Sequence, residues 1–436
     1  MSNFKAGFAR FDVTPPFGIC MQGYYNIRHA EGILDPLLAS ALAVSDGKKT
    51  AVVFSLDFIG INQTISDIAR NVIAEKTGLP YEAIFLACTH THTGPTLYPG
   101  QYPYDPEYNN VLYRKLADAA VTAINDLKDA VIETANGEVK DISFIRRYRM
   151  KNGKTQTNPG VGNPDIAEPI GLPDESLQLV KIKREAAPEI LLVNFQVHPD
   201  VIGGSKFSAD FPGFVRRSVE SVFSNAYCIY FNGAQGDTNH INTDKNGFRG
   251  SSGYEHSRYM GLSITGSVMK IYLKTLPVDA SRVDFCQNII DVPANRGDIS
   301  CIPLMEKYIE LHEAGKYEEI PYIGMEYTTV VAEAYRIKAL ENGPDNFKLY
   351  LNAVRFGDVV ISGIPGEPFT DIGRNIKENS PFKATFICCC ANGCEGYYPM
   401  KSAYDEGGYE ARSSSFKSGV AETIIDNSID MLKKLY

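Results

Sequence analysis

Apolar side chains recur along the chain with two spacings, one typical of buried strands and one typical of amphipathic helices. Ile84 to Ala87 form a continuous apolar run, as in a strand covered on both faces. Apolar residues from Ile65 to Ile73 recur every three or four positions, which indicates a helix. Similar patterns predict strands at Phe4–Val13, Leu38–Val44, Thr50–Leu56, Val131–Ile145, Ile190–Val197, Tyr227–Phe231, Val283–Val292, Leu349–Val354, Val359–Ile364 and Lys383–Cys390. They predict helices at Leu112–Leu127, Phe214–Val222, Tyr254–Leu273, Pro303–Ala314, Thr328–Leu340 and Phe416–Leu435.

This series of elements predicts an α/β fold with mixed sheets flanked by helices. Asp46-Gly47 and Gly357-Asp358 each separate two apolar runs and predict hairpins. Asp210 is expected to cap the helix that follows it. The segment Lys151–Pro173 is rich in Asn, Gly and Pro and is expected to be a long irregular loop. Because no internal repeat or linker interrupts the series, residues 1–436 are expected to form one domain.

Composition narrows the possible partners and locations. The net charge is −9 and the lysines and arginines are dispersed, so no nucleic-acid interface is expected. The N-terminus lacks the apolar core of a signal peptide, and no window reaches the ~18 apolar residues of a membrane helix. We therefore expect a cytoplasmic protein without a membrane span.

Nine cysteines, three of them consecutive at 388–390, indicate buried free thiols. Nothing in the sequence indicates an oligomeric state.

Residues that bind metals or carry protons follow several of the predicted strands. His90 and His92 come directly after one buried strand, and His198 comes directly after another. Glu367 follows a third strand and Asp57 a fourth. Only seven histidines occur in the chain, and neutral imidazole is the commonest protein ligand of zinc. The pattern predicts a metal site in a cleft at the strand ends, with ordinary polar loop residues as the alternative.

Two further segments supply candidate residues. Small side chains in the segment 232–240 permit a tight turn that exposes Asp237 and its neighbours as a second wall of the cleft. Arg146 begins a basic cluster with Arg147 and Arg149 at another strand end. This cluster either lies on the solvated surface or holds a substrate carbonyl or anion.

Five motifs occur in a fixed order along the chain, namely THTHTGP, FQVHPD, a GDxxxxN loop, PGEPFTDIGR and NGxxGYYP. In this order they resemble the neutral/alkaline non-lysosomal ceramidases, which are zinc-dependent amidases. The resemblance covers most of the chain, from AGFARFDVTPP onward, and stops before the family's C-terminal immunoglobulin-like domain. It implies a single ceramidase-like catalytic domain.

The resemblance also implies roles for particular residues. The zinc ligands of the family fall on His90, His198, Glu367 and Tyr397. His92 matches a histidine that lines the site, and Arg146 matches an arginine near the substrate carbonyl. Two imidazoles, a carboxylate and a phenolate supply nitrogen and oxygen donors suited to zinc.

The chain departs from the family pattern at the nucleophile. Asn239 stands where the family has its serine, and Thr238 reaches that place only if the loop slips by one residue. Cys394 replaces the first tyrosine of the family's Asn-x-Tyr-x-x-Tyr segment. We therefore expect a zinc-dependent hydrolase that cleaves an amide or ester bond with metal-activated water.

Several assignments within this expectation stay open. Asp237 or His92 would take the proton, and Arg146 or His240 would stabilise the oxyanion. The substrate is expected to be small and soluble, with a carboxylate or several hydroxyls to suit the arginines and the polar loop. One alternative is a covalent amidase that uses Thr238. Another is a homologue that binds a metal or ligand without catalysis.

Overall fold

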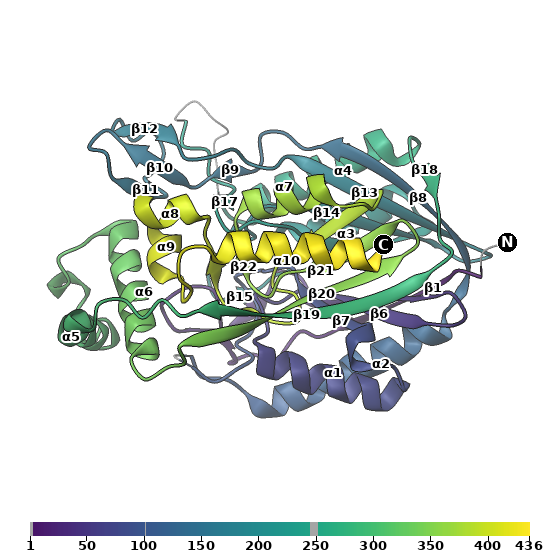
Figure 1. The fold of residues 1–436 in the computed structure, drawn as a ribbon, viewed down its shortest axis with the longest axis horizontal. Helices are drawn as coiled ribbons and strands as arrows, with labels where there is room; N and C mark the ends of the chain where they lie inside the picture. Colours follow the sequence, from purple (N-terminus) through teal and green to yellow (C-terminus); the bar gives the residue numbers. More distant parts are fainter. Residues whose placement is uncertain (1–2, 101, 245–251) are drawn as a thin grey trace.

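A large mixed sheet forms the centre of the computed structural model, which describes residues 3–100, 102–244 and 252–436 (Figure 1). Within the described residues this sheet has nine strands in the order β16-β14-β13-β8-β1-β5-β6-β7, with β18 paired to β8. The strands are β1 (Lys5–Asp12), β5 (Leu38–Ser45), β6 (Thr50–Leu56), β7 (Ile84–Cys88), β8 (Lys128–Glu138), β13 (Ser176–Arg184), β14 (Glu189–Phe195), β16 (Ala226–Asn232) and β18 (Leu276–Val278). The pairs β6–β7 and β14–β16 are parallel, and the other pairs are antiparallel.

The large sheet curls until strands from its two ends meet. The Ser55 hydroxyl of β6 donates a hydrogen bond to the Tyr230 carbonyl of β16, at 2.6 Å. A twist of roughly 20–25° between neighbouring strands accumulates over this many strands and reverses the direction of the last ones. Although β7 and β14 lie far apart along the strand order, this curl can therefore bring their carboxyl ends to the same place.

A second sheet packs against the inner face of the first. It has the order β19-β20-β21-β23 and contains β19 (Val283–Pro293), β20 (Asn346–Phe356), β21 (Val359–Gly363) and β23 (Ala384–Cys388). The core between the sheets holds Phe85 and Phe231 of the first sheet with Phe356 and Phe386 of the second, all almost fully buried. Burial on this scale is the main favourable contribution to folding. The two sheets thus share one core.

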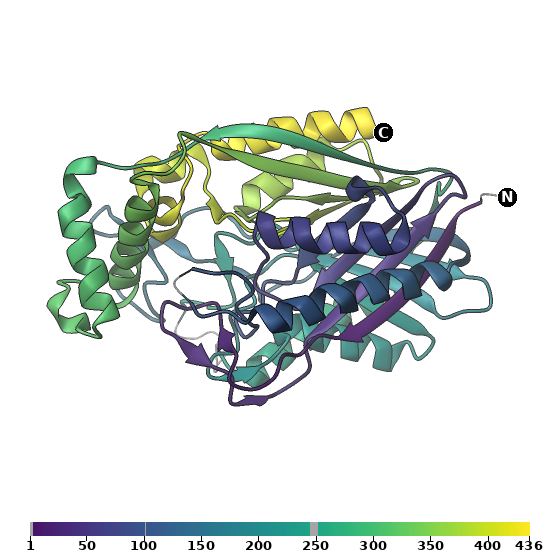
Figure 2. The ribbon, with the colours of Figure 1, turned by 90° about the horizontal axis from the view of Figure 1, so that it is seen from below.

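Helices cover the outer face of each sheet, so the molecule has four layers (Figure 2). The outer face of the large sheet packs against α1 (Gln63–Thr77), α2 (Pro106–Asn125), α3 (Asp210–Val222) and α4 (Tyr254–Tyr272). The second sheet is covered by α7 (Thr370–Asn379) and α10 (Val420–Leu435). The predicted α/β fold with mixed sheets flanked by helices is therefore confirmed.

The remaining elements lie around one end of the sheets. The pair α5 (Ile302–Glu313) and α6 (Gly324–Leu340) extends from the link between β19 and β20 and lies beside α8 (Lys401–Glu406) and α9 (Tyr409–Ser413) in Figure 1. Short strand pairs join loops in the same region: β2 (Cys20–Met21) with β3 (Arg28–His29), β4 (Gly32–Ile33) with β15 (Lys206–Phe207), β9 (Phe144–Ile145) with β17 (Thr238–Asn239), and β22 (Glu367–Pro368) with β24 (Tyr397–Tyr398). No helix in the described ranges is both long and apolar enough to cross a membrane.

The structure corrects three details of the sequence prediction. The strand expected at Val131–Ile145 is broken into β8 and β9, because the backbone turns between them with Asp141 at φ 62°. The segment Lys151–Pro173 contains β11 (Thr155–Thr157) and β12 (Ile166–Pro169), which pair on either side of β10 (Arg147–Met150). Asp210 is the first residue of α3 rather than its cap. Its carboxylate accepts hydrogen bonds from the backbone N–H groups of residues 201 and 202, at 2.9 and 3.0 Å.

Candidate functional site

Three imidazoles meet where β7 and β14 end. The Nε2 atom of His198 lies 3.2 Å from Nε2 of His90 and 3.1 Å from Nε2 of His92. All three side chains are almost completely buried, and their ligand atoms are close enough together to share one metal ion. The Nδ1–H of His90 donates to the Ile59 carbonyl at 2.6 Å, which directs its Nε2 atom at the other two rings.

The backbone places His90 in an unusual conformation. Its φ is 73°, in the left-handed region that a residue with a Cβ seldom adopts. Its backbone N–H donates to the Phe58 carbonyl at 2.9 Å, which ties the histidine to the segment after β6. Strain of this kind persists where the surrounding structure holds it, commonly at functional sites.

A carboxylate completes the group. Glu367 and Tyr397 are directly opposite each other in the parallel pair β22–β24. Oε2 of Glu367 lies 3.2 Å from Nε2 of His90 and 3.7 Å from Nε2 of His198. This oxygen is buried and faces the imidazole nitrogens of both histidines. A carboxylate oxygen and imidazole nitrogens that converge in this way form a donor set for a cation.

The charges of these groups are strongly coupled. Burial opposes the ionised form of Glu367, but His90, His198 and Arg146 together outweigh burial and lower the pKa of the carboxyl. Burial alone would lower the pKa of His90, but Glu367 raises it to about 10. A metal ion bound at Nε2 of His90 would displace that proton.

The other two histidines are held neutral. Burial, aided by the charge of His90, lowers the pKa of His92 to about 4. Burial and the charge of Arg146 lower the pKa of His198 well below its usual value. Nδ1 of His92 is buried and makes no hydrogen bond to a described residue. Before a cation binds, the site at pH 7 therefore contains two neutral imidazoles, the protonated His90 and an ionised carboxylate.

Arg146 lies behind this group, and its guanidinium is already paired. Its Nε donates to Glu410 at 2.7 Å and its Nη2 to the Gly236 carbonyl at 2.8 Å. Its Nη1 lies 3.5 Å from Nδ1 of His198, and the guanidinium carbon is 5.3 Å from the ring centre of Tyr397. Glu410, which is completely buried, was not identified from the sequence. The structure thus gives Arg146 the position of a buried support beneath His198 and Tyr397.

The predicted residues of the segment 236–240 lie close by but do not line the pocket. The carboxylate of Asp237 accepts hydrogen bonds from the backbone N–H and the hydroxyl of Thr370, at 2.7 and 2.6 Å. It thereby pairs a backbone N–H group at the start of α7 that has no partner within the helix, and it lies outside the pocket lining. Thr238 is fully buried, and its hydroxyl donates to the Gln235 carbonyl at 3.2 Å. Asn239 donates to Asn158 at 2.6 Å. These contacts are those of a structural turn.

His240 takes part in a separate contact. Its Nδ1 lies 3.0 Å from Oδ1 of Asp200, and it is buried outside the pocket lining.

Arg147 pairs with Glu406 at 3.1 Å, and Arg149 lies 3.7 Å from Glu406. The predicted basic cluster is therefore largely neutralised by acidic side chains.

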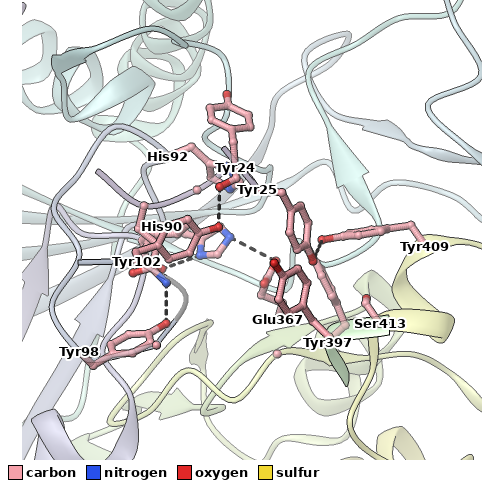
Figure 3. Close-up of a pocket in the computed structure, with 16 residues that line it drawn as sticks. Tyr24, Tyr25, His90, His92, Tyr98, Tyr102, Glu367, Tyr397, Tyr409 and Ser413 are labelled. Atoms are coloured by element: carbon pink, nitrogen blue, oxygen red, sulfur yellow. Dashed lines mark hydrogen bonds and ion pairs between the residues drawn. The ribbon is translucent and has the colours of Figure 1, made fainter. Parts of the chain in front are cut away.

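A pocket of about 390 Å³ opens above this candidate metal-binding group, and tyrosine is the commonest residue type in its wall (Figure 3). The sequence prediction missed these residues, which are Tyr24, Tyr25, Tyr98, Tyr102, Tyr335, Tyr409 and Ser413. Several of the tyrosine hydroxyls bond within the wall, such as Tyr25 with Tyr409 at 3.3 Å and Tyr98 with Gln22 at 2.6 Å. The one signal in the sequence was composition, because 25 tyrosines occur in a chain without tryptophan.

Two solved structures share this arrangement of elements over nearly the whole chain. Neutral ceramidase from Pseudomonas aeruginosa matches with a TM-score of 0.75 and 16% sequence identity, over 99% of this chain and 74% of its own. A ceramidase complexed with C2 matches with a TM-score of 0.74 and 16% identity, over 99% of this chain and 75% of its own. Neither a scan of protein-family models nor a search of curated proteins gives a match. The structural likeness confirms the fold that the motifs implied: the chain has the fold of the neutral ceramidases.

Proposed function

We propose that the chain is a zinc-dependent hydrolase that cleaves an amide or ester bond in a small substrate. The observation that carries this proposal is the group of three imidazoles and one carboxylate at the base of the tyrosine-lined pocket. The buried Oε2 of Glu367, which faces the imidazole nitrogens of His90 and His198, fits a bound cation. The two proteins with the same fold are ceramidases, which supports hydrolysis as the reaction class.

In this proposal His90, His198 and Glu367 hold the ion, with Tyr397 as a further oxygen ligand. Their nitrogen and oxygen donors suit zinc. When bound, zinc would supply the Lewis acidity that polarises a carbonyl and lowers the pKa of water towards ~7. His92 presents its Nε2 to the same centre and is neutral, so it can accept the proton of the attacking water. We assign this role to His92 rather than to Asp237, whose carboxylate is bonded to Thr370.

The contacts of Thr238 favour water as the nucleophile. We expect Thr238→Val, which keeps the shape and removes the hydroxyl, to retain kcat/KM within about tenfold, or roughly 1.4 kcal/mol of barrier. We expect His92→Ala to lose on the order of 100-fold or more, as for removal of a general base. Zinc content should be measured on both variants. A loss above about 100-fold in Thr238→Val with unchanged zinc would support the covalent route instead.

The pocket favours a short, neutral substrate. Its volume lies near the lower end of the ~300–1,000 Å³ typical of ligand sites. Among the described lining residues there is no lysine or arginine, so nothing in the wall is placed to pair with a substrate carboxylate. Tyrosine rings instead offer flat apolar surfaces with hydroxyls at their edges. This narrows the sequence expectation to a substrate that carries hydroxyls rather than a carboxylate.

The test is a hydrolysis screen of the zinc-loaded protein against short-chain N-acyl amines, N-acyl amino acids, activated esters and long-chain ceramide. We expect turnover of a short neutral amide or ester, less turnover of N-acyl amino acids and little of ceramide. Efficient hydrolysis of long-chain ceramide would contradict the small-substrate proposal. Inactivity on every substrate by protein that retains zinc would support the non-catalytic alternative.

A further inference from the structure

Two thiols lie in contact directly behind the metal-binding group. Sγ of Cys390 is 3.3 Å from Sγ of Cys394, and 3.4 Å from Nδ1 of His90. Cys390 is completely buried, whereas Cys394 is partly exposed to solvent. The pair therefore has one sulfur that solvent can reach and one that touches the histidine. No role in the proposed hydrolysis requires either thiol.

The segment that carries the two cysteines is fixed by hydrogen bonds at both ends. The backbone N–H of Cys390 donates to the Gly366 carbonyl at 2.8 Å, and that of Glu395 donates to the Pro365 carbonyl at 2.9 Å. Between them, Asn392 exchanges hydrogen bonds with the backbone of Leu86, at 2.7 and 2.8 Å. Cys390 and Asn392 both have positive φ, 46° and 54°, which folds the segment back on itself. The contact between the sulfurs is therefore built into the backbone.

Gly60 packs against Cys394, and only a residue without a side chain fits at this position. A Cβ added at Gly60 would lie 2.5 Å from Sγ and 2.6 Å from Cβ of Cys394. Real Cβ atoms do not approach other atoms so closely, so any larger residue at position 60 would force Cys394 to move. Glycine at position 60 thus leaves the space in which Cys394 contacts Cys390.

We propose that Cys390 and Cys394 form a reversible disulfide when the protein meets a hydroperoxide such as hydrogen peroxide. The more exposed Cys394 sulfur attacks one peroxide oxygen, the O–O bond breaks, and the departing hydroxide takes the thiol proton to give water and a sulfenic acid. Sγ of Cys390 then attacks the Cys394 sulfur, and the S–O bond breaks. Hydroxide leaves with the Cys390 proton as a second water. Two thiols are oxidised by two electrons in total, and one peroxide is reduced.

Oxidation of this pair would act on the metal-binding group through His90. The sulfurs must close to about 2.05 Å, which draws Sγ of Cys390 away from the imidazole. Outer partners of metal ligands are worth about 10–100-fold in metal affinity. Because the Ile59 carbonyl still accepts from His90, we expect oxidation to weaken zinc binding by about tenfold, the lower end of this range.

The disulfide can be detected without any assay of activity. The full chain is treated with hydrogen peroxide, unfolded in denaturant that contains the alkylating reagent so that buried thiols react, and digested with trypsin, which releases residues 384–401 as one peptide with four cysteines. We expect this peptide to lose two hydrogen atoms, to carry alkyl groups on Cys388 and Cys389 only, and to regain two thiols after treatment with dithiothreitol. A link between Cys389 and Cys390, or alkylation of Cys390 and Cys394, would overturn the proposal.

Variants test whether the built contact is responsible. Gly60→Ala keeps every thiol and should slow formation of the disulfide, whereas Cys286→Ser, which removes a half-buried thiol in β19, should leave it unchanged. Equal rates in Gly60→Ala and the parent protein would overturn the role of position 60. Zinc affinity is then compared between oxidised and reduced protein by competition with a chelator. Equal affinities would overturn the coupling to His90.

Discussion

Replacement of His90 by alanine is expected to lower zinc affinity by more than about 100-fold. The effect should exceed that of losing an outer partner, about 10–100-fold, because the variant removes a donor atom itself. His198→Ala should behave alike, since the Nε2 atoms of the two rings lie 3.2 Å apart at the same centre. The measurement is metal analysis of protein purified without chelators, followed by competition for zinc. We expect about one zinc ion per chain in the parent protein.

A matched control separates the site from histidine content in general. His29 is exposed in β3, and its Nδ1 contacts the Gly18 carbonyl. We expect His29→Ala to retain the zinc of the parent protein. Equal zinc content in His90→Ala, His198→Ala and His29→Ala would remove the assignment of the metal site.

The second large effect concerns stability. Asp57→Asn is expected to lower the free energy of unfolding by about 3–5 kcal/mol, as when one partner of a buried ion pair is removed. The Asp57 carboxylate is fully buried after β6, where Arg216 of α3 donates to it at 2.7 Å and the N–H of Leu38 at 2.9 Å. Asparagine keeps the shape but leaves the buried guanidinium without a counter-charge. Urea unfolding followed by circular dichroism measures the change.

Two comparisons make this prediction specific. Asp118→Asn breaks an exposed pair with Lys76, at 3.3 Å, and should cost less than about 1 kcal/mol. Adding Arg216→Met to Asp57→Asn should recover part of the loss, because the unpaired buried charge is then removed. A change below about 1 kcal/mol in Asp57→Asn would show that the pair contributes little.

The sequence predicted the place of the site because each candidate follows a strand. His90, His198 and Glu367 all come after apolar runs that are easy to recognise, and the structure brings their side chains together. Asp57 was identified by the same reasoning, but its partner Arg216 lies on a helix 159 positions away, and no local pattern indicates that pairing. Local signals thus found the strand ends but not the long-range contacts.

The pocket wall escaped prediction for a different physical reason. Apart from Tyr397, its tyrosines come from loops and from α6 and α9, where neither apolar periodicity nor a turn signal marks a residue as functional. The short strands β11 and β12 were missed because residues rich in Asn, Gly and Pro can pair when a neighbouring strand such as β10 offers its hydrogen bonds. Tertiary context overrode local preference in both cases.

The wide separation of the proposed metal ligands along the chain bears on the order of events during synthesis. His90 emerges from the ribosome long before Glu367 and Tyr397, and β22 cannot pair with β24 until residue 398 has been made. A metal ion held by all of these residues could therefore not nucleate folding, unlike the ion of small zinc domains whose ligands are close in sequence. The two sheets and their shared core must assemble first from non-local contacts, which makes folding slow. In the proposed assignment the ion would enter a protein that is already folded, so metal loading would be a step separate from folding.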